Sequence, residues 1–331
     1  MIISQTPYRV SFAGGGTDLP SFYEREAGAV LSVGLNQHMY VTVSPRFKAS
    51  TRIAYTKTEI ANSVDDIQHT IAREVLRMTE LGKHLEITTI GDVPSGTGLG
   101  SSSSLAVGML NALYAYKGQI TSPQQLAEQA CMVEIDRLKK PIGKQDQYAA
   151  AYGSLNFIAF NPDGSVHVEP VPYRPETLQE LESHTLLLYT AQQRSADDIL
   201  IKQSAGTHKK DKFTILCHMR DLALEMKSVI SSGSGNTIDE FADLLHQGWL
   251  LKKSLGFGIS NSTIDHWYEA AIAAGAQGGK LLGAGGGGFL LLVAPPEKHQ
   301  AIRDALGNPR ELPFEIDCRG SRIIFISDRY K

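Results

Sequence analysis

The sequence has few cysteines and no dense block of positive charge. Its three cysteines, Cys131, Cys217 and Cys318, are odd in number and too far apart to match the spacing of zinc ligands. This pattern predicts neither a disulfide framework nor a zinc site, and it is typical of a reducing compartment. Basic residues total 32 against 35 acidic ones and never exceed two in a row. The sequence therefore lacks the footprint of a nucleic-acid-binding protein, and a small-molecule ligand is favoured.

Long apolar runs are also missing. The longest aliphatic stretch, residues 289–294, is too short to cross a membrane. Residues 1–6 lack the basic segment and apolar run of a signal peptide, so we expect a cytoplasmic protein without membrane contact. No repeat of fixed period recurs, which argues against solenoids and propellers. With 331 residues, 42% of them hydrophobic, the chain is large enough for two packed domains.

Strand and helix patterns alternate along the chain. Residues 84–90 alternate as in a strand, and residues 65–81 carry apolar side chains at helical spacing up to Gly82. Ser122 and Pro123 open a helix predicted to run to about Leu138. The other predicted elements are a hairpin (155–160 and 166–171), strands (10–13, 39–44, 185–189, 289–293 and 322–327), helices (105–116, 214–230, 239–254 and 262–274) and a glycine-rich loop (275–288).

Three prolines in residues 170–175 mark the predicted boundary between two domains. The boundary gives an amino-terminal domain of residues 1–172 and a carboxy-terminal domain of residues 173–331. Because both halves mix helix and strand patterns, the predicted fold class is α+β.

The tract PSGTGLGSSSSL, residues 94–105, joins the strand pattern at 84–90 to a helix pattern. Its composition is typical of a linker, but its flanks favour a strand-to-helix loop whose backbone N–H groups converge on an anion. The next lysine after Gly100 is Lys117, so the common G-x-x-x-x-G-K-[ST] phosphate loop is excluded, and the dinucleotide fingerprint is also missing. Two interpretations remain open, a serine-capped turn and a loop that binds nucleotide phosphates.

Two further glycine clusters occupy residues 9–18 and 278–288. In the first, a strand pattern runs into three glycines, and Asp18 follows where its carboxylate could accept hydrogen bonds from sugar hydroxyls. The alternative is a glycine turn that Asp18 caps. Each cluster alone is a weak signal, but three in one chain favour a backbone packed around a ligand.

Two acidic residues, Glu134 and Asp146, follow the glycine/serine tract. If a phosphoryl donor binds the tract, a serine hydroxyl and one carboxylate are suitable ligands for Mg²⁺. A second carboxylate could orient an acceptor hydroxyl and take its proton, while Lys144 or Arg9 counters developing charge. Each acid taken alone is more typical of a solvated surface group, because the chain has 35 of them; it is their combination that favours a site.

These motifs resemble those of a known superfamily. Residues 94–102 look like the P-x-G-x-G-L-G-S-S motif of the GHMP kinases, which include galactokinase, homoserine kinase, mevalonate kinase and phosphomevalonate kinase. Residues 9–18 resemble the first motif of these kinases, and residues 278–288 resemble the last. The resemblance implies a two-domain α+β fold: a ribosomal S5 domain 2-like amino-terminal domain with a left-handed βαβ crossover, and a ferredoxin-like carboxy-terminal domain. ATP would bind between the two.

The resemblance also implies roles for individual residues. Ser102 and Glu134 match the ligands of Mg²⁺, Asp146 matches the catalytic aspartate, and Arg9 matches the arginine that stabilises the transferring phosphoryl group, with Lys144 as an additional cation. The residues expected to bind ATP are Pro94, Gly96, Thr97, Gly98, Leu99, Gly100, Ser101, Ser102 and Ser103. The residues expected to bind the acceptor are Gly15, Gly16, Thr17, Asp18, Arg194, Ser195, Gly285 and Gly286.

Within the superfamily, residues 12–20, 193–196 and 278–289 are similar to D-glycero-D-manno-heptose 7-phosphate kinases. These enzymes phosphorylate the anomeric hydroxyl and yield a 1,7-bisphosphate on the route to GDP-activated heptose for surface glycans. Arg194 with Ser195, aided by Lys202, is the expected grip on the substrate phosphate.

The similarity implies a cytoplasmic enzyme, monomeric or homodimeric, that uses ATP, Mg²⁺ and a sugar phosphate. Galactokinases carry Glu-His where this chain has Gly15-Gly16, which argues against galactose. Three alternatives stay open: another anomeric sugar kinase such as a fucokinase-like enzyme, a non-catalytic sugar or nucleotide sensor of the same fold, and an interaction protein with glycine-rich turns.

Overall fold

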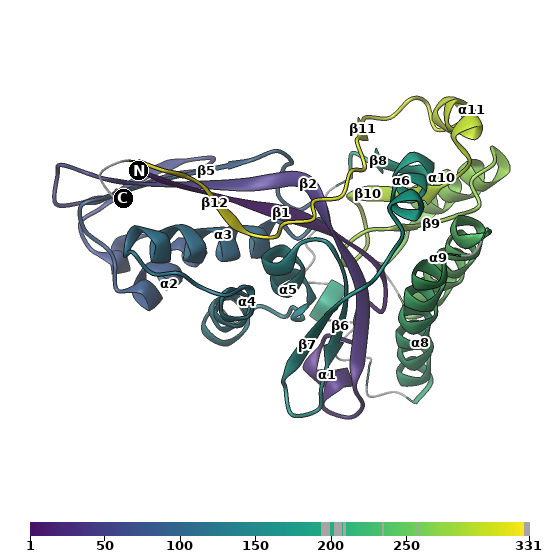
Figure 1. Cartoon of the computed structure of the whole chain (residues 1–331), viewed down its shortest axis with the longest axis horizontal. Helices are drawn as coiled ribbons and strands as arrows, with labels where there is room; N and C mark the ends of the chain where they lie inside the picture. Colours follow the sequence, from purple (N-terminus) through teal and green to yellow (C-terminus); the bar gives the residue numbers. More distant parts are fainter. Residues whose placement is uncertain (193–198, 202–206, 208–209, 234, 257, 328–331) are drawn as a thin grey trace.

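The computed structural model describes residues 1–192, 199–201, 207, 210–233, 235–256 and 258–327. These residues form two sheets, one of eight strands and one of four, with helices packed against both (Figure 1). The arrangement confirms the α+β class predicted from the sequence.

The larger sheet has the strand order β12-β1-β2-β5-β3-β4, and β6 and β7 extend it from β2. β3 and β5 pair in parallel, and the other pairs are antiparallel. The strands are β1 (Ile2–Ala13), β2 (Gly28–Pro45), β3 (Thr51–Ala54), β4 (Thr58–Ala61), β5 (Leu85–Gly91), β6 (Leu155–Phe160), β7 (Val166–Pro170) and β12 (Arg322–Ile326). The predicted hairpin is confirmed as β6 and β7, and the two strands predicted at 10–13 and 39–44 are parts of much longer ones.

Four helices lie on one face of this sheet (Figure 1). They are α2 (Thr70–Thr79), α3 (Ser101–Tyr116), α4 (Pro123–Cys131) and α5 (Gln145–Tyr152), and the short α1 (Pro20–Tyr23) follows β1. α3 packs directly on β1 and β2, and α2 and α4 pack on α3. Gly108 permits this close approach, because a Cβ there would lie 2.7 Å from Thr6 Oγ1 on β1. α3 is thereby fixed against the sheet with its first turn at the end of the 94–105 tract.

The smaller sheet is antiparallel, with the order β11-β8-β10-β9. Its strands are β8 (Thr185–Tyr189), β9 (Gly278–Leu281), β10 (Phe289–Val293) and β11 (Glu311–Leu312). Among the described residues, helices of this half include α6 (Pro175–His184), α8 (Lys210–Ser232), α9 (Thr237–Ser254), α10 (Ser262–Ala273), α11 (His299–Ala305) and the 3₁₀ turn η3 (Pro296–Lys298). Every residue of β10 is buried, as its unbroken apolar sequence predicts.

Two helix predictions need correction. The helix predicted at 65–81 is a 3₁₀ turn, η1 (Val64–Asp66), followed by the shorter α2. Ser63 caps η1. α2 ends at Thr79, and its C-cap residue Glu80 is left-handed with a φ of 55°, so the helix stops before the chain reaches Gly82. Ile67 is buried between the two elements, so its apolar spacing reflects burial rather than membership of the helix.

The helix predicted from Ser122 to about Leu138 also changes type. α4 ends at Cys131 and continues as a π-helix, η2 (Met132–Arg137), in which Leu138 N–H donates to the carbonyl of Val133. π-turns are rare and often occur at functional sites. This one carries Glu134, which is fully buried.

The loop predicted at 275–288 contains the strand β9. Gly278 and Gly279 are strand residues that the sequence reading assigned to a loop. A Cβ on Gly278 would lie 2.0 Å from the carbonyl oxygen of Ala242 on α9. The glycines therefore serve close packing between β9 and α9 rather than loop flexibility.

The last described strand returns to the larger sheet. β12 pairs antiparallel with β1, and Ile326 lies opposite Ile2. The division at residue 172 stays a prediction, and the pairing adds that residues 322–326 belong to the sheet of the first half.

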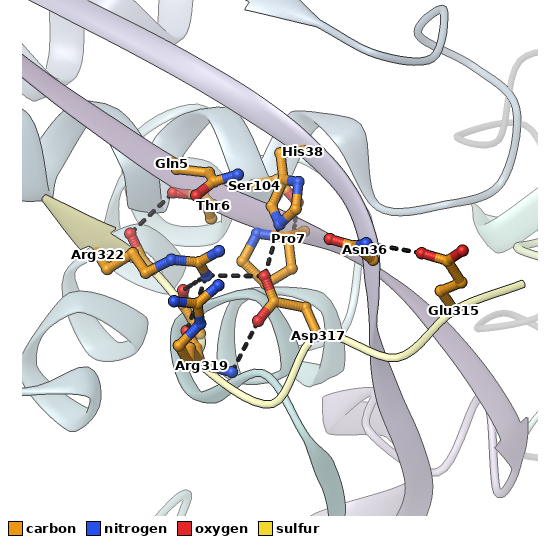
Figure 2. Close-up of polar contacts among 12 residues, drawn as sticks. Gln5, Thr6, Pro7, Asn36, His38, Ser104, Glu315, Asp317, Arg319 and Arg322 are labelled. Carbon is orange, nitrogen blue, oxygen red and sulfur yellow. Dashed lines mark hydrogen bonds and ion pairs between the residues drawn. The ribbon is translucent and has the colours of Figure 1, made fainter. Parts of the chain in front are cut away.

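A buried ionic cluster fastens the returning segment (Figure 2). Asp317 Oδ2 lies 2.5 Å from His38 Nε2 on β2 and 2.7 Å from Arg322 Nη1, and Asp317 Oδ1 accepts from the Arg319 backbone N–H at 2.8 Å. Asp317 and His38 are each almost fully buried. Burial alone would raise the pKa of Asp317, but the hydrogen bonds from His38 and Arg322 outweigh it and lower the pKa from 3.8 to about 2.

Asp317→Asn is expected to destabilise the fold by about 3 kcal/mol, because the substitution removes the buried carboxylate that pairs with Arg322 and accepts from His38. Urea unfolding of both proteins measures the loss. Glu315→Gln is the matched control, because Glu315 lies on the same segment but pairs with Asn36 in an exposed position (Figure 2). Equal stability of all three proteins would contradict the role given to the cluster.

The same cluster makes stability depend on pH at the acid end. A carboxylate whose pKa is lower in the folded state stabilises the fold above its unfolded pKa and stops doing so as pH falls through the folded value. For Asp317 the contribution is complete above about pH 4 and lost toward about pH 2. The difference in unfolding free energy between wild type and Asp317→Asn should therefore shrink over that interval.

The three cysteines are free thiols, and Cys131 is buried. Within the ranges that the structure describes, no helix combines the length and apolar character needed to cross a membrane.

Candidate active site

A cavity lies where the two sheets and their helices meet. One wall comes from the first glycine cluster, including Gly15, Gly16 and Asp18, and another from the 94–105 tract with the first turn of α3. The start of α5 and the π-helix η2 contribute acidic side chains, and α9 and β9 of the second half close the opposite side. Motifs far apart in the sequence thus share one cavity.

The glycine/serine tract forms the predicted strand-to-helix loop. Gly96, Gly98 and Gly100 all have positive φ values, between 75° and 82°, and α3 begins at Ser101 directly after Gly100. No side chain among the described residues caps this helix start. Its first-turn N–H groups are therefore available to an anion at the positive end of the helix dipole.

Arg9 and Asp146 form a bidentate ion pair next to the glycine/serine loop. Arg9 Nε and Nη2 each donate to a different oxygen of Asp146, both at 2.7 Å, and Nη1 donates to the carbonyl of Gly98 at 2.6 Å. Arg9 is 6% exposed. Paired donors of this kind fix the carboxylate in one orientation, so strand β1, the loop and α5 hold Asp146 rigidly in place.

Glu134 is the centre of a dense hydrogen-bond network. Its Oε1 accepts from Ser102 Oγ at 2.5 Å, and its Oε2 accepts from Ser103 Oγ at 2.7 Å and from Gln147 Nε2 at 2.8 Å. The Lys140 ammonium bridges Glu134 Oε1, at 3.0 Å, and Ser102 Oγ, at 2.6 Å. The two groups predicted to ligate a metal are therefore in direct contact.

The donor set fits Mg²⁺ bound together with phosphates. Mg²⁺ commonly takes one or two carboxylates and completes its shell with water and substrate phosphate oxygens. The Lys140 ammonium lies between Ser102 Oγ and Glu134, which marks this position as suited to a cation. Over the described ranges no group of three or more histidine, cysteine or acidic side chains could hold a metal by itself.

Asp18 is buried close to Asp146. It accepts hydrogen bonds from the backbone N–H groups of Gly16, at 3.0 Å, and Gln145, at 3.2 Å. Burial raises the pKa of Asp18, and the negative charge of Asp146 raises it further. A Cβ on Gly143 would lie 1.9 Å from Asp18 Oδ2. Glycine at 143 therefore lets the segment before α5 close over this carboxylate.

The third glycine cluster packs against the loop itself. A Cβ on Gly283 would lie 2.6 Å from the Cα of Gly98, and one on Gly288 would lie 2.3 Å from the carbonyl oxygen of Thr97. Both glycines have positive φ values. The two motifs therefore meet backbone to backbone and position the loop from the side of the smaller sheet.

Gly98→Ala is expected to damage the loop much more than Gly96→Ala. Both positions have φ near +80°, so each alanine costs about 1–2 kcal/mol of backbone strain. A Cβ at Gly98 would also lie 2.8 Å from the carbonyl oxygen of Leu282, which adds about 1–3 kcal/mol, whereas one at Gly96 meets no described atom within 4 Å. Melting temperature measures the difference, and identical values for the two variants would contradict the packing argument.

Several predicted residues lie elsewhere. The Lys144 ammonium donates to the carbonyl of Gly164, in the turn between β6 and β7, at 2.6 Å and lies over the ring of Tyr23. These contacts give no support to its predicted role as a cation beside Asp146. Thr17 is buried and bonds to backbone groups of Gly14 and Ala29, which is a structural role.

The remaining predicted residues divide into three groups. Pro94, Thr97 and Leu99 support the loop from outside the cavity lining, and Thr97 Oγ1 donates to the carbonyl of Pro94. Gly285 and Gly286 pack on the backbone of Ile259 rather than line the cavity, because a Cβ on Gly285 would lie 2.7 Å from the Ile259 Cα and Gly286 N–H donates to the Ile259 carbonyl. Arg194, Ser195 and Lys202 lie outside the described residues.

Three lysines that the sequence reading missed line the cavity: Lys140, Lys252 and Lys280. Lys140 lies six residues after Glu134, and Lys280 lies inside the third glycine cluster. For Lys140 and Lys280, this closeness to a motif in the sequence could have indicated a place in the site. Nothing in the sequence near Lys252 indicated such a place, because Lys252 lies on α9 in a segment without a motif.

Comparisons with known proteins show which family the chain belongs to. The model of the GHMP kinases N terminal domain matches residues 67–154, and that of the GHMP kinases C terminal domain matches residues 225–310. A Campylobacter jejuni protein described as D-glycero-alpha-D-manno-heptose 7-phosphate kinase is 30% identical over 329 residues, covering 95% of this chain and 96% of that protein. The chain therefore belongs to the GHMP kinase family.

Two further similar proteins are described as sugar kinases or sugar phosphate kinases. The crystal structure of a D-glycero-D-manno-heptose 1-phosphate kinase from Bacteroides thetaiotaomicron superposes with a TM-score of 0.81 at 26% identity, covering 99% of this chain and 100% of that one. The L-fucokinase/L-fucose-1-P guanylyltransferase of Bacteroides fragilis is 26% identical over 80% of this chain, which spans only 32% of that longer protein. The protein is accordingly a sugar kinase of the GHMP family.

Proposed function

We propose that this kinase transfers the γ-phosphoryl group of ATP to the anomeric hydroxyl of D-glycero-D-manno-heptose 7-phosphate. The product is the 1,7-bisphosphate, which serves the synthesis of a GDP-activated heptose for surface glycans. The observation that carries the proposal is the 30% identity to the Campylobacter jejuni heptose 7-phosphate kinase over nearly the whole of both chains. The cavity supports it, since an anion-binding loop and a buried carboxylate suited to sugar hydroxyls share one space.

In the proposed complex, the phosphates of ATP lie on the loop from Gly96 to Ser103. The N–H groups of the first turn of α3 donate to phosphate oxygens, and the helix dipole adds to the attraction. Ser102 and Glu134 would hold Mg²⁺, with the Lys140 ammonium, which contacts both, left to pair with the phosphates. When bound, the ion would supply positive charge that offsets the charge of the phosphates.

Asp146 is the proposed base for the acceptor. Arg9 fixes both of its oxygens, and each oxygen keeps a lone pair that can accept the proton of the anomeric hydroxyl. Arg9 then stabilises charge on the transferred group. Asp18 binds a neighbouring hydroxyl of the sugar, and Gly15 and Gly16 let the backbone approach the ring.

The terminal phosphate of the acceptor needs its own cationic partner. Arg194 and Ser195, with Lys202, are the residues that we propose for it on sequence grounds. We place the reaction in the cytoplasm, where ATP is available, and propose a monomer or homodimer that acts on small molecules, with neither nucleic acid nor membrane as a partner.

A fucokinase-like activity is the second candidate, because the Bacteroides fragilis L-fucokinase/L-fucose-1-P guanylyltransferase matches 80% of this chain. That reading predicts a neutral sugar as the better acceptor. The heptose proposal predicts the opposite preference.

The deciding experiment measures ADP release with four acceptors: heptose 7-phosphate, the same heptose without its phosphate, L-fucose and galactose. We expect the highest kcat/KM with heptose 7-phosphate. A higher value with L-fucose would favour the fucokinase-like activity, and no turnover of heptose 7-phosphate would reject the heptose proposal. ATP binding without turnover of any acceptor would indicate a sensor.

A further inference from the structure

Two buried lysines from the second half of the chain line the cavity. Lys252 is on α9 and Lys280 is on β9, and they are 8% and 6% exposed. Lysine is almost never buried to this degree without a partner of opposite charge, because removing an ammonium group from water is costly. Their burial therefore calls for a physical explanation.

Both ammonium groups contact neutral backbone oxygens. Lys280 Nζ donates to the carbonyls of Ser11, at 2.8 Å, and Phe12, at 2.9 Å. Lys252 Nζ donates to the carbonyls of Gly283, at 2.5 Å, and Leu281, at 3.3 Å. No carboxylate of the described chain forms an ion pair with either lysine. Each ammonium has three N–H donors, so each keeps one donor beyond its two carbonyl partners.

The surroundings of the pair are positive. Burial and, to a smaller extent, the charge of Arg9 together lower the pKa of Lys252 to about 8. Burial also lowers the pKa of Lys280 well below its usual value, with added repulsion from Lys252 and Arg9. The nearby carboxylate of Asp146 is already paired with Arg9. An anion entering the cavity would relieve this repulsion.

Both lysines lie close to Arg9. Lys252 bonds to Gly283, which packs on Gly98, and the carbonyl of Gly98 accepts from Arg9. Lys280 bonds to Ser11 and Phe12, just after Arg9 on the strand that leads into the first glycine cluster. This position lies between the loop proposed for ATP and the cluster proposed for the acceptor.

We propose that Lys252 and Lys280 are catalytic residues that donate hydrogen bonds to the phosphoryl group during its transfer. The inference rests on the proposed kinase reaction. The anomeric oxygen forms a bond to the γ-phosphorus, the bond from that phosphorus to the β–γ bridging oxygen breaks, ADP leaves, and the hydroxyl proton passes to Asp146. The two ammonium groups keep their protons and balance charge on the equatorial oxygens.

The test replaces each lysine by methionine, which has a similar length and no charge. Lys252→Met and Lys280→Met should each lower kcat by about 100-fold or more, with smaller changes in KM, because the lost contact is strongest in the transition state. Lys253→Met is the matched control: it changes the next residue of α9, whose ammonium pairs with Asp265 at 3.3 Å, and should leave kcat unchanged.

A nucleotide measurement keeps the inference separate from the heptose proposal. Wild type should bind a non-hydrolysable ATP analogue more tightly than ADP, and the two methionine variants should lose most of this preference, since only the analogue carries a γ-phosphate. Kinetics use whichever acceptor the wild type phosphorylates, so failure of heptose 7-phosphate as acceptor rejects the proposed function alone.

Other results would overturn the lysine assignment. A higher KM for the sugar phosphate at unchanged kcat and unchanged nucleotide preference would place the lysines at the acceptor's own phosphate. A lower melting temperature with unchanged kcat per folded molecule would make them structural. If the methionine variants do not fold, Lys252→Gln and Lys280→Gln take their place, because glutamine keeps a polar side chain but lacks the positive charge; unchanged kcat and nucleotide preference in these variants would reject the assignment.

Discussion

Asp146→Asn is expected to lower kcat by about 100-fold or more while ATP binding is retained. Asparagine keeps the size of the side chain but cannot take the proton of the acceptor hydroxyl. It also removes the negative charge that two nitrogens of Arg9 contact at 2.7 Å, so Arg9 is no longer held in its bidentate geometry. Steady-state turnover with the best acceptor, together with a calorimetric Kd for ATP, measures the two effects separately.

Asp136→Asn is a suitable control for this variant, because Asp136 is an exposed acid on the π-helix and does not line the cavity. Its kcat should equal that of the wild type. Near-normal turnover of Asp146→Asn would remove Asp146 from its role as base. A loss of ATP affinity as large as the loss of kcat would instead assign Asp146 to nucleotide binding.

Glu134→Gln is expected to raise the Mg²⁺ concentration needed for half-maximal activity by about 10–100-fold. The two oxygens of Glu134 accept from four side-chain donors, whereas glutamine offers one oxygen and adds two donors of its own. The substitution therefore removes the proposed charged ligand of Mg²⁺ and also disturbs the orientation of Ser102. Activity titrated against Mg²⁺ at saturating ATP measures the shift.

The control for this prediction is Glu128→Gln. Glu128 lies six residues earlier, on α4, is exposed, and accepts a hydrogen bond from Gln124. We expect its Mg²⁺ dependence to match that of the wild type. An unchanged Mg²⁺ dependence in Glu134→Gln, with normal folding, would show that the metal binds elsewhere.

Local patterns predicted the parts of the site that neighbouring residues build. The glycine/serine tract was predicted as a strand-to-helix loop because its flanks carry clear periodicity, and α3 does begin at Ser101. Ser102 and Glu134 were paired through the family resemblance, and the structure brings them within 2.5 Å. Short motifs of this kind can be interpreted from the sequence, because their chemistry depends mainly on the backbone of the motif itself.

Long-range packing explains what the sequence reading missed. Nothing near Lys252 in the chain indicates that α9 brings its ammonium to a carbonyl of the third glycine cluster. Lys144 lies next to a motif, yet its ammonium contacts the turn of a hairpin that forms only in the folded chain. The change to a π-helix at Met132 has no propensity signal, because no residue type specifically favours the wider turn.

The glycine-rich region after Ala276 shows why glycine content alone does not distinguish a loop from a strand. Glycine lowers strand propensity, so residues 278–281 were predicted as loop. In the structure they form β9, because α9 approaches so closely that no side chain fits at Gly278. Whether a glycine serves a turn or a close contact depends on the neighbour, and the neighbour here is more than thirty residues away in the sequence.

The most direct test of the account is the position of the phosphate that the enzyme adds. Incubation with Mg²⁺, ATP and heptose 7-phosphate, followed by ³¹P NMR, should show a second sugar phosphate whose phosphorus couples to the anomeric proton, formed in equal amount with ADP. A phosphate on another hydroxyl, or release of inorganic phosphate without a second sugar phosphate, would contradict it.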